Sequence, residues 1–177
     1  RALSTAPASA GAAALLGAVA TVPAAQHRPF YPSPDQDIVQ VEAFGMDATP
    51  VTNGEFASFV AENPRWRRDR VPRLLADERY LSSWSTSTEP SQASAAPVTQ
   101  VSWHAARAYC KAQGGSLPTI SQWELAADAT ATTAQGGRAD PATLARILAW
   151  YGRGSAPPAD VGGGAANLHG LHDMHGL

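Results

Sequence analysis

The chain has 177 residues, among them 13 Lys and Arg, 15 Asp and Glu, five His and one Cys. This length is that of a single domain. The net charge of −2 excludes the overall positive field typical of proteins that bind nucleic acid or anionic lipid. The single Cys excludes an internal disulfide framework and an intrachain thiolate zinc site. Fifteen Gly and fourteen Pro predict a loop-rich fold rather than a bundle of long helices.

The N-terminal segment has the composition of an export signal. Arg1 is the only charge in the first 26 residues, and residues 10–22 form an apolar stretch whose length suits a signal-peptide core and is too short to span a bilayer. Val22 and Ala24 are the small residues that precede a cleavage site. We therefore predict a signal-peptide-like segment over residues 1–25, cleavage after Ala24, and an exported, periplasmic or secreted protein with no membrane span. An Ala-rich disordered tail is the alternative.

A lead-in, a strand and a capped helix are predicted next. Residues 26–37 contain three Pro and form an extended lead-in, and residues 38–44 are rich in β-branched side chains, which favours a strand. Thr52 and Glu55 have the spacing of a capping box, so a helix is predicted to begin there and to end near Glu62. The predicted buried side chains of this helix are Phe56, Phe59 and Val60.

The only basic cluster in the sequence is residues 65–70, which contain four Arg. We favour a solvated loop with Trp66 turned into the core, and a surface that grips an acidic partner is the alternative. Residues 74–81 predict a helical turn, residues 82–96 a surface loop, and residues 97–101 a short strand.

Three further helices are predicted from the N-cap residues Ser102, Thr119 and Asp140. The first is expected to end at Gly114 and the last at Gly152. The overlapping capping pairs of the middle helix are Thr119 with Gln122 and Ser121 with Glu124. The side chains of the last helix that are predicted to face inward are Leu144, Ile147, Leu148 and Tyr151. A Gly- and Pro-rich linker follows over residues 154–166.

Three sequence blocks each occur once, in an order and spacing that chance does not explain. They are Thr-Pro-Val-Thr-Asn-Gly-Glu-Phe at 49–56; Val-Ser-Trp at 101–103, Ala-Tyr-Cys at 108–110, Leu-Pro-Thr at 117–119 and Trp-Glu at 123–124; and Asn-Leu-His-Gly-Leu-His-Asp-Met-His-Gly at 167–176. Together they resemble the sulfatase-modifying-factor, or formylglycine-generating enzyme, family. The resemblance covers residues 38–177 and implies one such domain, truncated at its C-terminus. It implies an α+β, complex C-type-lectin-like fold with short helices, few strands and much loop.

The resemblance also implies a chemistry. Enzymes of this family use O₂ to oxidise a Cys in a Cys-x-Pro-x-Arg segment of a target protein, with a reactive Cys pair that binds copper as thiolates. In the family this pair lies in the C-terminal part of the domain. The catalytic residues are therefore expected beyond Leu177, and this chain alone is expected to be inactive.

The resemblance implies a structural disulfide from Cys110 to a later Cys. A buried free thiol and a catalytic thiol are the other interpretations. Calcium is also implied by the family, but Leu177 stands where Asn is usual, and the Gly-rich residues 161–166 lack a supporting acid. No copper or calcium ligand is therefore identified in the chain, and a divergent branch of the family is predicted.

The remaining candidate residues have structural explanations. His169, His172 and His175 recur every three residues beside Asp173, a set that could bind zinc, copper or iron. We favour a surface turn in which Asp173 accepts backbone N–H groups, and predict no metal site. The residues predicted to be structural are Trp103 and Trp123, which would anchor helices to an Ala-rich core, Glu124, which would cap N–H groups, and Asn167.

Two functions from different classes remain. The first is an exported domain of the formylglycine-generating type, acting on a protein or peptide. The alternative is a non-catalytic, lectin-like binding or accessory module, for example one that helps a periplasmic metalloenzyme to mature.

Overall fold

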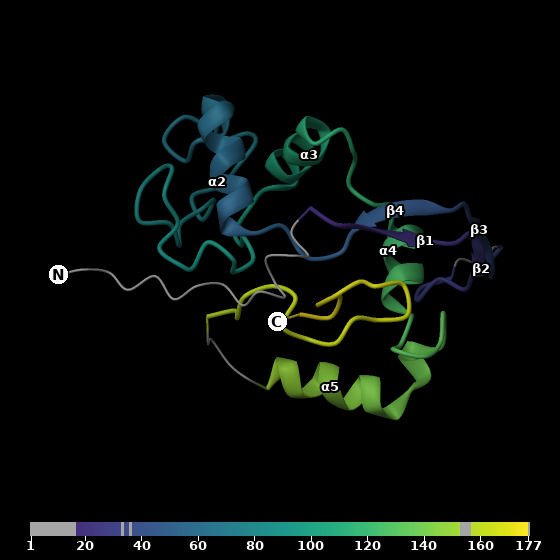
Figure 1. The fold of residues 1–177 in the computed structure, drawn as a ribbon. Coiled ribbons are helices and arrows are strands. Elements are labelled where there is room, and N and C mark those ends of the chain that lie inside the picture. The colour runs from purple at the N-terminus through teal and green to yellow at the C-terminus, as the bar shows by residue number, and fades with distance from the viewer. Residues whose placement is uncertain (1–16, 33, 36, 153–156, 177) are drawn as a thin grey trace.

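The computed structural model describes residues 17–32, 34, 35, 37–152 and 157–176. Within these residues, four α-helices, two 3₁₀ helices and four short strands form an α+β fold (Figure 1). The strands form two antiparallel ladders of two strands each: β1 (Val19–Val22) with β4 (Phe44–Asp47), and β2 (Ala25–His27) with β3 (Val39–Val41). The described part of the chain contains no helix with the length and hydrophobicity needed to cross a membrane.

Part of the predicted signal segment lies in the folded domain. β1 pairs with β4 over all four of its residues, and Val22 at its end has no exposed surface. This side chain belongs to a core cluster with Val41, Leu125, Ala126 and Leu171. Cleavage after Ala24 would remove β1 and leave β4 unpaired. A mature protein cleaved at that position therefore cannot contain the β1–β4 ladder. Export itself stays a prediction.

The strand predicted over residues 38–44 is divided between two ladders. β3 pairs with β2 and β4 pairs with β1, so the chain changes partner at residues 42–43. The strand predicted over residues 97–101 is wrong: Pro97 makes only an isolated bridge with Thr52. A proline has no N–H to give to a ladder, which limits pairing at this point.

Helix α2 (Asn53–Glu62) confirms the capping-box prediction. The Thr52 hydroxyl accepts the Glu55 N–H at 3.2 Å, and the Glu55 carboxylate accepts the Thr52 N–H at 2.8 Å. The helix lies beside α3 (Trp103–Ala112), and the two bury an aromatic cluster between them and the following loops (Figure 1). The aromatic members of this cluster are Phe56, Phe59, Trp66, Tyr80, Trp84 and Tyr109.

The loops that follow α2 contribute more side chains to the aromatic core than the sequence predicted. Trp66, in the 3₁₀ helix η1 (Pro64–Trp66), is buried as expected. Trp84 is also buried, and its Nε1–H donates to the Asn53 side chain at 3.2 Å, so the prediction of residues 82–96 as a surface loop is wrong at this position. In place of the helical turn predicted over residues 74–81, the structure has two hydrogen-bonded turns. The Ala76 N–H donates to the Pro72 carbonyl at 3.2 Å in the first, as in one turn of a helix, and Leu81 in the second has a φ of +50°.

The other three N-caps are confirmed. Ser102 accepts the Ala105 N–H at the start of α3, and Thr119 forms a capping box with Gln122 at the start of α4 (Ile120–Ala127). Asp140 accepts the Thr143 N–H at the start of α5 (Pro141–Tyr151). The overlapping pair of Ser121 and Glu124 does not form, because the Glu124 carboxylate is used elsewhere.

Helix α5 exposes the side chains that were predicted to face inward. Leu144, Leu148 and Tyr151 are 42%, 69% and 72% exposed, Ile147 is half-buried, and the fully enclosed side chain of the helix is Thr143. The helix lies at the bottom edge of the fold (Figure 1) and packs mainly on η2 (Gly137–Ala139). Its apolar positions therefore lie on the outside of the described domain.

The predicted burial of the two helix-anchoring Trp residues is also wrong. Trp103 is 61% exposed and Trp123 is 40% exposed. The buried residues of α3 are Ala105 and Tyr109, whereas the Trp103 ring at its start lies 5.6 Å from the Arg107 guanidinium on the outer face.

We expect substitution of the buried Trp84 and of the exposed Trp103 to change the free energy of unfolding by clearly different amounts. Trp84→Ala should lower the free energy of unfolding by about 3–5 kcal/mol, because it leaves a cavity in the aromatic cluster. Trp103→Ala should lower it by less than about 1 kcal/mol, because its ring is mostly in water. Urea titrations of both variants measure the difference, and equal losses would contradict the assignment of Trp84 to the core.

Removal of β1 tests whether it belongs to the domain. A variant that begins at Ala25 should lose about 2 kcal/mol or more relative to one that begins at Gly17, because burial of Val22 alone contributes about 1.5–3 kcal/mol. The comparison is made by urea denaturation. Equal midpoints for the two variants would show that β1 is dispensable, as a cleaved leader requires.

Candidate functional site

The C-terminal segment, residues 167–176, is a turn organised by Asn167. The Asn167 side chain donates to the Ala126 carbonyl at 2.8 Å and accepts the N–H groups of His169 and Leu171 at 3.0 and 3.1 Å. The Asn167 N–H donates to the Leu171 carbonyl, which closes the turn around Gly170 at a φ of +82°. One amide side chain thus attaches this segment to the end of α4.

Asp173 fixes the same segment to the Gly-rich stretch. Its Oδ2 atom accepts the Gly162 N–H at 2.6 Å, and its own φ is +57°. A side chain on Gly164 would come within 3.2 Å of the other carboxylate oxygen, so this position favours glycine. Asp173 accepts a backbone N–H, which is the arrangement that the sequence predicts for it.

The three histidines of this segment point to different partners. His172 Nδ1 donates to the Gly164 carbonyl and His175 Nε2 to the Ala127 carbonyl, both at 2.8 Å, whereas His169 Nε2 is buried with no hydrogen-bond partner. Among the residues that the structure describes, no three side chains of His, Cys, Asp or Glu converge as metal ligands. The structure therefore does not bring His169, His172, Asp173 and His175 together.

A cavity of about 460 Å³ lies between α5 and the C-terminal segment. Asp160, Asp173 and His175 contribute polar groups to its lining, and Arg146 contributes a cation from α5. Gly176, at a φ of +105°, lies against the Trp150 ring with no room for a side chain between them. The guanidinium in this cavity opposes the binding of a second cation, which weighs against a metal ion held by the two acids.

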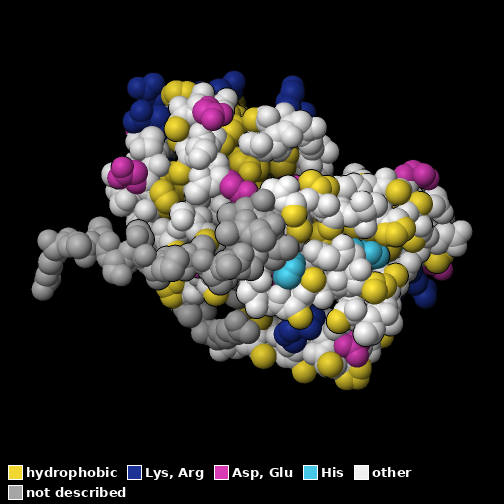
Figure 2. All heavy atoms as spheres, in the orientation of Figure 1, with side chains coloured by type: hydrophobic (Ala, Val, Ile, Leu, Met, Phe, Trp, Pro, Cys, Tyr) yellow, Lys and Arg dark blue, Asp and Glu magenta, His cyan; other side chains and the backbone are white. Residues whose placement is uncertain are grey.

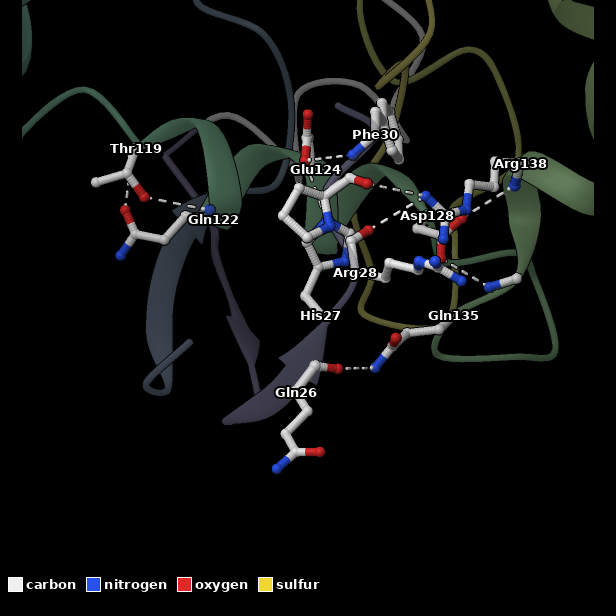
Figure 3. Close-up of polar contacts among 12 residues, drawn as sticks. Gln26, His27, Arg28, Phe30, Thr119, Gln122, Glu124, Asp128, Gln135 and Arg138 are labelled. Carbon is white, nitrogen blue, oxygen red and sulfur yellow. Dashed lines mark hydrogen bonds and ion pairs between the residues drawn. The ribbon is translucent and has the colours of Figure 1, made fainter. Parts of the chain in front are cut away.

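A buried polar group on α4 connects the C-terminal half to the N-terminal strands (Figure 3). Glu124 is 6% exposed, and its Oε2 atom accepts from His27 Nε2 at 3.2 Å and from the Phe30 N–H at 3.1 Å. His27 is 1% exposed, and its Nδ1 atom has no hydrogen-bond partner. Glu124 therefore holds residues of another segment rather than its own helix.

Asp128, which directly follows α4, adds further polar contacts with the next loop (Figure 3). Its carboxylate accepts the N–H groups of Gly136 and Arg138 at 2.9 and 3.0 Å, and the Arg138 guanidinium donates to the Arg28 carbonyl at 3.2 Å. Sequence reasoning missed His27, Asp128 and Arg138. The contacts of His27 with Glu124 and of Arg138 with Arg28 join residues about a hundred positions apart, so no local pattern signals them, whereas Asp128 accepts from residues eight and ten positions later in the next loop.

Comparison with known proteins follows the same blocks of sequence. The model of the sulfatase-modifying factor enzyme 1-like domain matches residues 10–177. The chain belongs to this family. The match begins upstream of residue 38, where the sequence motifs placed the start of the domain.

Three relatives of known name are similar to the chain. It is similar to the formylglycine-generating enzyme of Mycobacterium tuberculosis, with 29% identity over 186 residues, which covers 78% of this chain and 62% of that protein. It is 32% identical to the inactive C-alpha-formylglycine-generating enzymes 2 of Bos taurus and Mus musculus, over 50% of this chain and 39% and 38% of those proteins. The chain thus spans less than two thirds of the length of each relative.

Cys110, on α3, is the only thiol of this sulfatase-modifying-factor domain segment, and it is half-buried. Burial raises the pKa of the thiol, and the Asp47 carboxylate raises it further. Burial likewise raises the pKa of neighbouring Tyr109 to about 12, with Glu55 and Asp47 adding to the effect. These surroundings keep Cys110 protonated and a poor nucleophile at neutral pH.

The copper and calcium implied by the family do not fit the residues present. Copper would require a second thiolate, and the chain has one Cys. Asp173, the acid of the third motif, already uses one carboxylate oxygen for a backbone N–H, and Leu177 lies outside the described residues.

The burial of Cys110 predicts slow alkylation. Iodoacetamide should modify it more slowly than a free thiol at pH 8, and the rate should rise only above the ordinary thiol pKa. Asp47→Asn removes a nearby negative charge, lowers the pKa of the thiol and should increase the rate at pH 8. Asp160→Asn, on an exposed loop, is the matched control. Equal rates for the two variants would contradict the proposed influence of Asp47.

Removal of the Glu124 carboxylate should destabilise the whole fold. Glu124→Ala leaves His27 and the Phe30 N–H without an acceptor, and we expect a loss of about 2–4 kcal/mol, since each unsatisfied buried donor costs about 1–3 kcal/mol. Glu89→Ala, at an exposed loop position, should change stability by less than about 0.5 kcal/mol. Thermal unfolding followed by circular dichroism measures both, and a similar small change for Glu124→Ala would contradict its role.

Proposed function

We propose that this protein is an oxidase of the formylglycine-generating type, in which O₂ oxidises a Cys side chain of a target protein. The observation that carries the proposal is the match to the formylglycine-generating enzyme of Mycobacterium tuberculosis over 78% of the chain. The described residues contribute the framework of the domain, and the sequence contains one Cys and therefore no reactive thiol pair of its own. Cys110 is not a member of that pair, because its surroundings favour the protonated thiol.

A non-catalytic accessory module is the second candidate. Two of the relatives are named inactive and share 32% identity with this chain, slightly more than the enzyme does, although over a shorter segment. In that case the protein binds a partner protein and leaves its Cys unchanged. Either function suits a C-type-lectin-like domain, which we propose for the fold because its short helices and two-stranded ladders leave much of the chain as loop.

We propose export as well, from the apolar residues 10–22. The pairing of β1 with β4 then requires processing before Val19 rather than after Ala24. N-terminal sequencing of the mature protein distinguishes the two positions. A mature chain that begins at Ala25 would favour the leader, and one that begins before Val19 would favour the folded strand.

The oxidase proposal is tested with the full-length protein and a peptide that contains a Cys-x-Pro-x-Arg segment. Mass spectrometry should detect conversion of the Cys to an aldehyde in air and none without O₂. A peptide with Ser in place of Cys controls for adventitious oxidation. Cys110→Ser should retain activity. Binding of the peptide without conversion would overturn the oxidase and support the accessory module.

A further inference from the structure

We propose that a basic groove between residues 73–79 and residues 100–102 binds an extended acidic segment of a partner protein. The groove has a volume of about 520 Å³, and its charged lining consists of Arg73, Arg79 and Asp77. It contains no thiol, so the proposal does not depend on the proposed oxidase activity.

The groove lies in a positively charged part of an otherwise acidic chain. Residues 65–79 contain six Arg and three acids, a net charge of +3, whereas the whole chain has a net charge of −2. Figure 2 shows Lys and Arg side chains gathered along the top of the molecule, over the half that contains α2 and α3. This half therefore attracts negatively charged partners that the rest of the surface repels.

Two of these arginines are committed to the fold. Arg68 donates to the carbonyl oxygens of Leu81 and Trp84 at 2.9 and 3.0 Å, and Arg67 forms an ion pair with Asp69 at 3.1 Å. Their guanidinium groups hold loops together, so they are not the groups that we assign to the partner.

The two arginines that line the groove are available to a ligand. The Arg73 and Arg79 side chains are 87% and 81% exposed, and their ion pairs with Glu78 and Asp77 are long, at 3.8 and 3.9 Å. Exposed ion pairs of this kind contribute little, and a carboxylate from a partner can replace them with two parallel hydrogen bonds to one guanidinium.

Leu74 adds an apolar contact between these cations. It lines the groove and is 90% exposed, more than any other large aliphatic side chain among the described residues. An isolated exposed Leu needs no explanation, but one inside a basic groove favours a segment that carries apolar side chains beside its carboxylates.

Hydrogen bonds hold the residues beside the groove in place before any partner binds. Leu81 and Gln100 both have left-handed backbones, with φ of +50° and +57°, and the Leu81 N–H donates to the Gln100 carbonyl at 2.9 Å. The Gln100 side chain also accepts from the Ser82 hydroxyl and the Ser83 N–H, at 2.8 and 2.9 Å. These bonds attach the wall at Gln100 to residues 81–83, which directly follow the other wall, so a partner does not have to order this part of the groove on binding.

The floor of the groove is part of the aromatic core. Ala76 and Tyr80 are buried, and the Tyr80 hydroxyl donates to the Trp66 carbonyl at 2.9 Å. The segment that carries Arg73 and Arg79 is thus attached to the core by Ala76, which lines the groove, and by Tyr80, which directly follows Arg79. An acidic protein segment fits this site better than a nucleic acid, because Asp77 and the negative charge of the whole chain oppose a long polyanion.

The proposal is tested by fluorescence anisotropy with a labelled eight-residue peptide of alternating Glu and Leu, added to the full-length protein. We expect saturable binding that weakens as salt is raised. A peptide of alternating Lys and Leu has the wrong charge and should bind at least tenfold more weakly. A peptide of alternating Glu and Ser has no apolar side chain and should bind at least threefold more weakly.

Matched variants separate the groove from charge alone. Arg73→Glu/Arg79→Glu should weaken binding of the Glu-Leu peptide at least tenfold. Arg28→Glu/Arg146→Glu, which makes the same change at exposed arginines elsewhere, should leave binding within twofold. Leu74→Ser should weaken binding of the Glu-Leu peptide but not of the Glu-Ser peptide. Melting curves confirm that each variant is folded.

Three results would overturn the proposal. One is the absence of saturable binding of the Glu-Leu peptide. Another is an equal loss of binding in the two double variants, which would mean that net charge alone is responsible. The third is a single-stranded DNA oligonucleotide of equal charge that displaces the peptide at a lower concentration than unlabelled peptide does, which would assign the surface to nucleic acid.

Discussion

The buried carboxylate of Glu124 is the contact on which the arrangement of this domain depends. It joins α4 to His27 and Phe30, residues more than ninety positions earlier in the chain. Isolated two-stranded ladders are at best marginally stable in water, so β1–β4 and β2–β3 need an external support. Glu124, together with the packing of Val22 on Leu125, provides it by fixing the N-terminal segment against α4.

Other polar side chains also bind backbone groups of loops in this half of the molecule. Asp128 shapes the loop after α4, Asn167 closes the C-terminal turn, and Asp173 accepts a backbone N–H from the Gly-rich stretch. Loops cannot satisfy their buried backbone groups with ladder bonds, so side chains take over this work. This explains why the carboxylates and the amide of the motif regions are occupied structurally rather than aimed at a metal.

The candidate functional features are distributed over both halves of the molecule. The half around α2 and α3 carries the aromatic core, the half-buried thiol of Cys110 and the basic groove. The half around α4 and α5 carries the third motif and the cavity beside Trp150. The Cys110 thiol does not line the groove, so substitution of Arg73 and Arg79 tests the proposed recognition of an acidic segment without altering that thiol.

The sequence by itself determined the features that depend on neighbours along the chain. The N-caps at Thr52, Ser102, Thr119 and Asp140 form as predicted, because a cap joins a side chain to an N–H three residues later and needs no tertiary partner. The family follows from motifs read in the same local way.

The tertiary structure decided everything that depends on which surfaces meet. Trp84 is buried while Trp103 is exposed, Glu124 binds His27 rather than capping its own helix, and α5 turns its Leu side chains outward. The hydrophobic effect favours burial of an apolar side chain but does not select the residues that it packs against. A carboxylate likewise accepts from whichever donor the fold brings close. Trp84 and Glu124 find their partners in residues far along the chain, and Trp103 and the Leu side chains of α5 stay exposed because the fold brings no core surface to them, which no local pattern could have identified.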